Sequence, residues 1–525
     1  MRKATDITEN KKEQIVTLGL FIILGGLLRL LPSIQADFPL NDGGLFTTMI
    51  KDLVANDFLL PPYTSYNQLD IPYAYPPFAF YITGYLHRLS GILLIDLVRI
   101  LPGIFSTMTI PAFYFLSRQF LSSSRQQLIA TAAFAFIPRS FKWLIMGGGL
   151  TRALGFLFSI LTLYQAWQLF HKPKLKHILL TALWGSAVVL SHPETTYFTV
   201  ISVLLFFVLF NIKEGFNKEV WMKTFLVGML VFTLTSIWWG TILRYHGLSA
   251  FSTAIKTQWK ISPSIMSLLT FKFTEEVFFD LLAVLGLIGI WWELKKRGFF
   301  LPIWFLMIFF LTPRSARTFV VLPFALLIST GLVEVILPQF SNMSKEKRIN
   351  NENKSLENVF VFYILLISFI SSLFLPYVDQ AELSVLPKSE REDMKWIKDN
   401  TPESSVFISI PSKNTWSDVT AEWFPTLTAR KNNLTVQGYE WLPDTNFQQK
   451  WQEHESLHQC LEKSSNCLLD YIHKHKQRGV PHYLFINRNQ KMDLDQERIF
   501  LALKDHPSFK IVFLVKGITI FSVRK

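Results

Sequence analysis

The sequence has very little cysteine, because Cys460 and Cys467 are its two cysteines in 525 residues. So few cysteines exclude a disulfide framework and a zinc site built from several thiolates. A single helix running through both would separate them by about 10 Å, which is too far for a disulfide. If the stretch Lys463-Ser-Ser-Asn466 breaks the helix, the two can bond, provided that this part of the chain lies outside the cytoplasm.

Charged residues are also scarce, at 17% of the chain, and bases outnumber acids to give a formal net charge of +13. The Lys and Arg residues lie in short clusters between apolar segments and do not form one basic domain. This pattern argues against a nucleic-acid partner and is typical of loops between membrane spans. With 50% hydrophobic residues and a mean hydropathy of +0.28, the chain is predicted to be a polytopic α-helical membrane protein.

The basic N-terminal region has no small-residue cleavage site after it, so the apolar run 15–31 is predicted to remain as a transmembrane helix. Segment 78–89 would reach about 20 Å as a helix, against a hydrocarbon core of about 30 Å, and is predicted to be juxtamembrane. The basic loops then all face one side, which predicts about eleven crossings of the plasma membrane with a cytoplasmic N-terminus. The ten further spans are expected at 97–116, 128–137, 154–170, 178–190, 197–210, 225–243, 277–292, 299–311, 319–337 and 359–375.

Composition divides the chain at about residue 378. Residues 1–378 form the predicted transmembrane domain, whose first outward loop, 35–95, carries juxtamembrane helices. Residues 379–525 have nearly balanced charge and are predicted to form a soluble, extracytoplasmic α/β domain. Its helices are expected at 390–400, 446–475 and 494–504, and its strands at 406–410, 482–487, 511–515 and 518–523.

An acidic stretch, Asp37-Phe-Pro-Leu-Asn41-Asp42-Gly43-Gly44, follows the first span directly. Ionisable groups at the edge of a bilayer are candidates for functional sites, so Asp42, and secondarily Asp37, are candidate catalytic carboxylates. The alternative is an ordinary helix cap, in which Asn41 or Asp42 accepts hydrogen bonds from the first N–H groups of the next helix.

The second outward loop contains Arg139, Lys142 and Arg152 around Gly147-Gly-Gly149, with no acidic residue. Successive backbone N–H groups at the start of a helix, aided by cations, can bind an anion such as phosphate. A loose turn with cations at the lipid headgroups is the alternative.

A late outward loop carries Arg314 and Arg317, although the positive-inside rule disfavours two arginines there. Guanidinium groups match phosphate oxygens in a bidentate manner, which favours binding of a substrate phosphate. Contact with the phosphates of membrane lipids is the alternative.

Two further groups of residues are candidates. His192 and Glu194, together with Asp42, can in principle hold a divalent cation, although Glu194 also suits a helix N-terminus. In the C-terminal part, the side chains suited to contact with an acceptor sugar or peptide are also suited to packing, and they are Trp423, Arg430, Glu440 and Trp441.

With these residues in view, the chain resembles the GT-C superfamily of polytopic glycosyltransferases, which includes protein O-mannosyltransferases and aminoarabinose transferases. Asn41-Asp42-Gly43 lies where that superfamily has an acidic pair after its first span, with Gly43 in place of the second acid. Tyr75-Pro76-Pro77 is similar to its His-Pro-Pro juxtamembrane motif, here a candidate entrance to the site. Weaker similarities lie at Arg99-Ile-Leu-Pro102, at 314–323 and at Asn400-Thr-Pro402.

The resemblance implies a polyprenyl-phosphate sugar as donor and a glycan, lipid or protein acceptor that enters from the outer face, with inversion at the anomeric carbon. Asp42 would then deprotonate or orient the acceptor hydroxyl. Arginines would stabilise the departing lipid phosphate, and the candidates are Arg314, Arg317, Arg152 and Arg139. The alternatives are a flippase or transporter for lipid-linked saccharides and a non-catalytic membrane scaffold.

Overall fold

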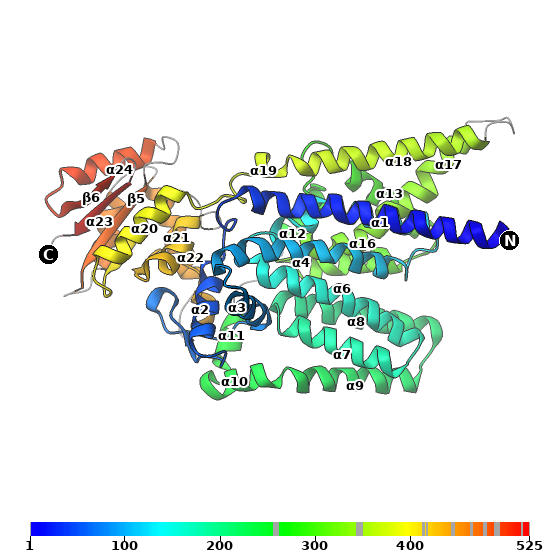
Figure 1. The fold of residues 1–525 in the computed structure, drawn as a ribbon, viewed down its shortest axis with the longest axis horizontal. Coiled ribbons are helices and arrows are strands. Elements are labelled where there is room, and N and C mark those ends of the chain that lie inside the picture. Colours follow the sequence, from blue (N-terminus) through cyan, green and yellow to red (C-terminus); the bar gives the residue numbers. More distant parts are fainter. Residues whose placement is uncertain are drawn as a thin grey trace.

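The computed structural model describes residues 2–255, 262–342, 350–411, 415, 418–442, 447–461, 466–475, 480–487, 494–515 and 518–523. A long bundle of helices occupies one part of the molecule, and a small sheet with helices caps one end of it (Figure 1). The N-terminus lies at the opposite end of the bundle from this sheet (Figure 1).

A helix is present at each of the eleven expected spans. Within the part of the chain that the structure describes, six helices are long and apolar enough to cross a membrane, or seven if the bent pair α9 and α10 is counted as one span. Because several others are shorter, the number of crossings stays a prediction. The helices are α1 (Arg2–Gln35), α4 (Leu94–Ser117), α5 (Ser124–Phe136), α6 (Gly149–His171), α7 (Leu175–Val189), α8 (Pro193–Glu214), α9 (Lys218–Leu234) with α10 (Ser236–His246), α13 (Leu281–Lys295), α14 (Phe300–Leu311), α16 (Val321–Thr330) with the π-helical η4 (Gly331–Ile336) and α17 (Leu337–Asn342), and α18 (Asn350–Leu373).

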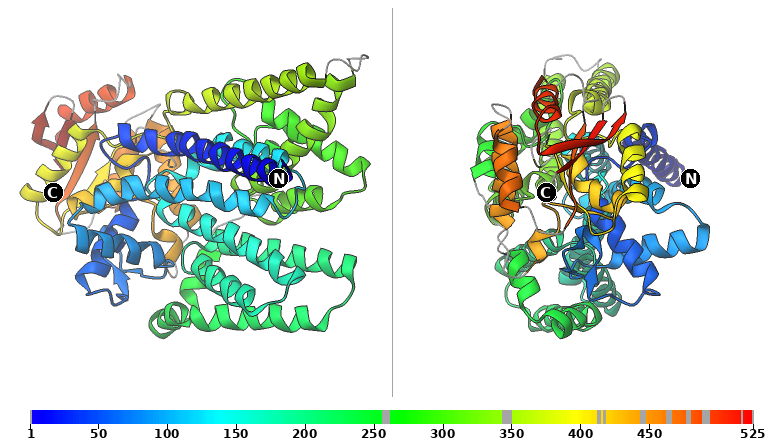
Figure 2. Two further views of the ribbon diagram at one scale, coloured as in Figure 1. Left: turned by 45° about the vertical axis from the view of Figure 1, so that its right-hand side comes forward. Right: turned by 90° about the vertical axis from the view of Figure 1, so that its left-hand side faces the viewer.

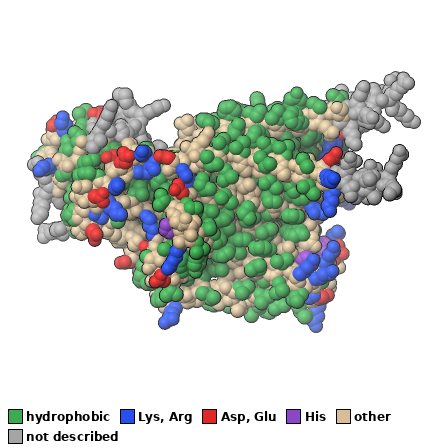
Figure 3. Space-filling model, viewed as in Figure 1, with side chains coloured by type: hydrophobic (Ala, Val, Ile, Leu, Met, Phe, Trp, Pro, Cys, Tyr) green, Lys and Arg blue, Asp and Glu red, His purple; other side chains and the backbone are tan. Residues whose placement is uncertain are grey.

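Hydrophobic side chains cover the middle of the bundle, and charged side chains gather towards both ends of the visible face (Figure 3). Exposed apolar residues such as Ile23, Leu183 and Phe232 contribute to this covering. A belt of this kind suits contact with lipid, since a water-soluble protein seldom exposes so large an apolar surface.

The segment between α1 and α4 folds at the bundle end that carries the sheet (Figure 1). The expected short juxtamembrane segment is α3, which ends where Gly91 adopts a left-handed conformation. The elements of this segment are α2 (Gly44–Ala55), β1 (Tyr63–Thr64), η1 (Tyr66–Gln68), β2 (Ile71–Pro72) and α3 (Phe78–Ser90). Short helices in the other connections are η2 (Pro138–Ser140), η3 (Lys142–Leu144), α11 (Ser249–Ile255), α12 (Ser262–Leu269), α15 (Ala316–Phe319) and α19 (Leu375–Val378).

The C-terminal part contains a five-stranded sheet in the order β4-β3-β5-β7-β6. Strand β3 pairs in parallel with β4 and β5, and β7 pairs antiparallel with β5 and β6. Each expected helix and strand is present, and the sequence analysis missed α21. The elements are α20 (Lys388–Asn400), β3 (Val406–Ser409), α21 (Val419–Thr428), β4 (Lys431–Asn432), η7 (Tyr439–Trp441), α22 (Phe447–Leu461), α23 (Asn466–His475), β5 (His482–Asn487), α24 (Leu494–Lys504), β6 (Phe509–Val515) and β7 (Ile518–Val523).

Helices lie on both faces of this sheet, as two views at right angles show (Figures 1 and 2). One hydrophobic cluster contains α20 and α21 residues and also Phe38, which follows the first span. A bridge between Leu40 and Val385 adds a backbone connection. The acidic stretch and the C-terminal part are therefore packed as one unit.

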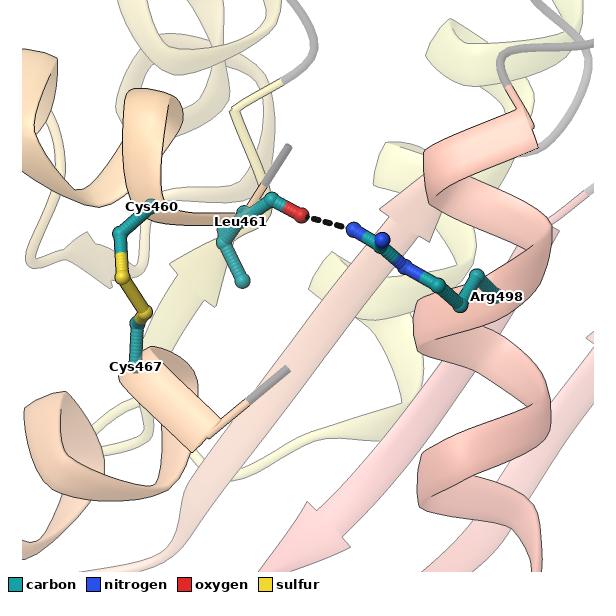
Figure 4. Close-up of a disulfide and its surroundings, with 4 residues drawn as sticks. All are labelled: Cys460, Leu461, Cys467 and Arg498. Atoms are coloured by element: carbon teal, nitrogen blue, oxygen red, sulfur yellow. Dashed lines mark hydrogen bonds between the residues drawn. A yellow bond between two sulfur atoms is a disulfide. The ribbon is translucent and has the colours of Figure 1, made fainter. Parts of the chain in front are cut away.

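Helix α22 is described to Leu461 and α23 from Asn466, and the stretch that could break the helix lies mostly outside the described residues. Cys460 of α22 and Cys467 of α23 form a disulfide, with their Cα atoms 6.2 Å apart, which is closer than one continuous helix would place them (Figure 4). Arg498 of α24 donates a hydrogen bond to the Leu461 carbonyl oxygen beside it (Figure 4). The disulfide links the C-terminal end of α22 to the N-terminal end of α23.

Candidate active site

Asp42 is bound by the glycine-rich loop that was expected to bind an anion. One carboxylate oxygen accepts the Gly148 N–H at 2.7 Å, and the other lies 2.7 Å from Nη2 of Arg152. Gly148 directly precedes α6, so the helix dipole also favours the negative charge. The anion that occupies this loop is therefore the protein's own carboxylate.

The glycines are required because two backbone segments approach closely here. A Cβ on Gly147 would lie 1.9 Å from the backbone oxygen of Asp42, and one on Gly148 would lie 2.3 Å from its Oδ2. Gly43 has φ of +122°, a conformation that residues with a Cβ rarely adopt. A side chain at Gly147 or Gly148 would therefore displace Asp42.

Helix α21 supplies a second carboxyl group beside Asp42. Glu422 Oε1 accepts hydrogen bonds from the Gly43 and Leu45 N–H groups, both at 3.3 Å. The alternative interpretation, in which Asn41 or Asp42 caps α2, is not supported, because Glu422 accepts hydrogen bonds from these N–H groups instead. Burial raises the pKa of Glu422 to about 8, and the charge of Asp42 adds to the increase.

Sequence reasoning missed Glu422. The sequence feature that could have indicated Glu422 is its position as an isolated acidic residue in the apolar run Ala421 to Pro425. Such a residue is costly to bury without a partner, and its partners lie more than 370 positions earlier in the chain.

Arg314 and Glu194 form a second charged pair. Nε of Arg314 lies 2.8 Å from Glu194 Oε1, and Ser315 donates a hydrogen bond to the same carboxylate. The neighbouring Glu194 raises the pKa of Arg314, and Glu440 adds to this effect. Arg314 thus interacts with carboxylates from α8 and from the C-terminal part.

The structure does not gather a metal-binding set from His192, Glu194 and Asp42. Nδ1 of His192 accepts the Thr195 N–H at the start of α8, and burial lowers its pKa to about 4, so the ring is neutral. Glu194 and Asp42 are paired with different arginines. Within the described ranges, no three His, Cys, Asp or Glu side chains are grouped closely enough to hold a metal ion.

Tyr75 lies between these two charged pairs. Its hydroxyl is 3.2 Å from Oγ1 of Thr151, and its ring centroid is 5.7 Å from that of Trp441. Burial raises the pKa of Tyr75. Pro76 and Pro77 follow it, and Pro77 is the N-cap residue of α3.

Burial also raises the pKa of Glu440, and Arg314 opposes this effect.

The remaining predicted phosphate ligands, Arg139 and Arg317, are both paired with Glu275. The distances to its Oε1 are 3.1 Å and 3.0 Å, and Lys142 lies 2.9 Å from its other oxygen. Burial alone would raise the pKa of Glu275, but the three cations lower it. Lys142 also contacts Asp379 and Glu382. Arg139 is only 5% exposed, so this cluster holds the loops together more readily than it binds a substrate.

Three other predicted residues have structural partners. Asp37 is 62% exposed and forms an ion pair with Arg391, so it does not join Asp42. Trp423 is fully buried, and Arg430 is buried and donates hydrogen bonds to the backbone oxygens of Lys398 and Thr401. The other two residues expected to contact the acceptor lie near the charged pairs. Trp441 packs against Tyr75, and Glu440 interacts with Arg314.

Comparison with models of protein families and with curated protein sequences found no match. Solved structures do match. The arabinofuranosyltransferase AftD from Mycobacteria has a TM-score of 0.59 at 14% identity, and the match covers 98% of this chain and 40% of AftD. This chain thus spans well under half the length of AftD.

Two shorter proteins match over most of their length. ArnT from Cupriavidus metallidurans, in a structure with bound undecaprenyl phosphate, has a TM-score of 0.54 at 11% identity over 96% of this chain and 97% of ArnT. The oligosaccharyltransferase of Archaeoglobus fulgidus has a TM-score of 0.52 at 12% identity over 90% of this chain and 69% of that protein. The chain described here has the fold of the GT-C membrane glycosyltransferases.

Proposed function

We propose that this protein is a membrane glycosyltransferase that transfers a sugar from a polyprenyl-phosphate donor to an acceptor at the outer face, with inversion. The observation that carries the proposal is the position of Asp42, which is 33% exposed and held by Arg152 at the end of a GT-C bundle. A partly exposed carboxylate in a fixed position is suited to accept a proton from an acceptor hydroxyl.

In the proposed reaction, an acceptor hydroxyl oxygen attacks the anomeric carbon of the donor sugar. Asp42 takes the hydroxyl proton as the new bond forms. The bond from the anomeric carbon to the phosphate oxygen breaks, and its electron pair leaves with the polyprenyl phosphate. A base on one side of the sugar and cations on the other match the charges that develop.

Arg314 is the preferred ligand for the departing phosphate. Its side chain is 52% exposed, against 22% for Arg152, 40% for Arg317 and 5% for Arg139. Binding of a phosphate would add a second anion beside Arg314, which already contacts Glu194. Arg152 is assigned to Asp42, and Arg317 is secondary because it shares Glu275 with other cations.

The donor class rests on two supports. The structure of ArnT contains undecaprenyl phosphate, and its fold is shared by this chain. The acidic and basic pairs described above also lie together at one bundle end, whereas a carrier of saccharides would place such groups near the middle of its spans.

Proteoliposomes with radiolabelled polyprenyl-phosphate sugars test the proposal, with extracted glycolipids and glycoproteins as candidate acceptors. We expect transfer by the unaltered protein and a loss of roughly 100-fold or more in Asp42→Asn. Asp57→Asn is the matched control, because Asp57 lies in the same outward segment and is 85% exposed. Equal rates for Asp42→Asn and Asp57→Asn would remove Asp42 from the base role.

A further inference from the structure

Glu422 is a buried carboxyl group to which the proposed reaction assigns no part. Its Oε1 binds two N–H groups of the backbone that follows Asp42, namely those of Gly43 and Leu45. Its Oε2 is buried and has no hydrogen-bond partner among the described residues. A buried oxygen of this kind is costly when ionised and much less costly when it carries a proton.

The two carboxyl groups differ in their electrostatic partners. Asp42 has the guanidinium of Arg152 and the Gly148 N–H. The titratable groups that the described residues place against Glu422 are acidic or neutral: they are Asp42 before α2, Glu440 of η7, and Tyr66 of η1, whose hydroxyl donates a hydrogen bond to the Glu422 backbone oxygen. When two carboxyl groups interact, the more deeply buried one, which has no adjacent cation, retains its proton to higher pH.

We propose that Glu422 is a positioning residue of the site, which stays protonated while Asp42 is ionised and so fixes the backbone at 43–45 without adding a second negative charge. The raised pKa of about 8 agrees with this assignment. Ionisation of Glu422 would place a charge that repels both Asp42 and an anionic donor phosphate. The expected effect of Glu422 on catalysis rests on the proposed function, whereas the assignment of a proton to Glu422 does not.

The closing experiment therefore begins with purified protein in lipid nanodiscs, without any donor. The carbonyl stretch of protonated carboxyl groups is followed by infrared difference spectroscopy from about pH 5 to about pH 9, a range that spans ordinary and raised carboxyl pKa values. We expect a band that disappears with a midpoint near pH 8 and that is missing in Glu422→Gln. The exposed Glu403→Gln is the control and should keep the band.

Coupling to Asp42 is tested with Asp42→Asn. Because the charge of Asp42 raises the pKa of Glu422, its removal should move the midpoint of the band to lower pH. An unchanged midpoint, or the same band in Glu422→Gln as in the unaltered protein, would overturn the proposal.

Thermal unfolding gives a second readout. A carboxyl group whose pKa is raised in the folded state contributes stability at low pH that is lost as the pH rises through about 8. Glu422→Gln has no such group and should not lose this stability. The Tm of Glu422→Gln minus that of the unaltered protein should therefore increase as the pH rises from about 5 to about 8. A constant Tm difference over this range would argue against a buried proton on Glu422.

Where transfer is measurable, the rate of the unaltered protein should fall as the pH rises through about 8, and Glu422→Gln should lose this dependence. A purely structural role would give both proteins the same pH profile. If the band titrates as expected but no donor is used, the proposed function fails and the assignment of the Glu422 proton stands.

Discussion

The indole Nε1 of Trp423 donates a hydrogen bond to the backbone oxygen of Asn41, 2.9 Å away and 382 positions earlier in the chain. The ring is fully buried and packs edge-on against Phe38, with 4.5 Å between centroids. Helix α21 thus fixes the backbone on both sides of Asp42, through Trp423 before it and Glu422 after it. The candidate catalytic carboxylate is positioned as much by the C-terminal part as by the bundle.

Trp423→Phe should reduce sugar transfer more than it reduces stability. The substitution keeps the ring that packs in the core and removes the hydrogen bond to Asn41, at a cost of about 1 kcal/mol in the free energy of unfolding. Trp396→Phe is the control, because Trp396 stacks on Phe513 in the same cluster. Equal activities of the two variants would count against a role for the Trp423 hydrogen bond in placing Asp42.

Gly148→Ala should abolish most of the transfer activity while the protein still folds. The added Cβ would lie 2.3 Å from Asp42 Oδ2 and 2.6 Å from Arg152 Nη2, so the charged pair must separate. Loss of one preorganised electrostatic contact costs roughly 100-fold in rate. Gly240→Ala in α10 meets nothing within 4 Å and is expected to behave as the unaltered protein. Both are measured in the proteoliposome assay, with thermal unfolding as a check on folding.

Glu275→Gln should be strongly destabilising. The neutral side chain would leave Arg139, Lys142 and Arg317 close together without the carboxylate they share. Removing one partner of a buried ion pair costs about 3 kcal/mol or more, whereas Asp57→Asn breaks an exposed pair and should cost under about 0.5 kcal/mol. Chemical denaturation in detergent measures both, and similar values would show that the cluster contributes little.

The topology predicts which introduced cysteines an impermeant thiol reagent can reach in intact cells. Cysteines at the exposed positions 57 and 403 should react from outside, and one at position 174, between α6 and α7, should react only after the membrane is opened. The native Cys460 and Cys467 are bonded to each other and give no background without reductant. Reaction of position 57 but not of position 403 would contradict an outward C-terminal part.

Much of the fold could be predicted because each helix or strand is encoded by its own residues. Apolar runs gave a helix at every expected span, and the short run at 78–89 forms the separate short helix α3, whose juxtamembrane position stays a prediction. Strand β5 has the expected limits, His482–Asn487, because its short continuous apolar run, Tyr483 to Ile486, is bounded by polar residues. Helix α21 was missed because Pro425 lies inside it and its apolar residues resemble a short buried strand.

The site was less predictable, because its residues meet across long stretches of chain. Local sequence indicated Asp42, the Gly147 to Gly149 loop, Arg152 and Arg314 as chemically active. It did not indicate that Asp42 itself fills the glycine-rich loop, nor that Arg139 and Arg317 share Glu275.

By itself, the sequence determined a bundle of apolar helices, a C-terminal sheet and an acidic stretch directly after the first span, since hydrophobic runs and turn residues act over short distances. Only the tertiary structure decided which charges are paired. It separated Asp37 from Asp42, and it brought Glu422 to the place where the adjacent acid is missing at Gly43. The reason is physical: a buried charge is stabilised by whatever group the fold places within about 4 Å, and sequence distance has no bearing on that contact.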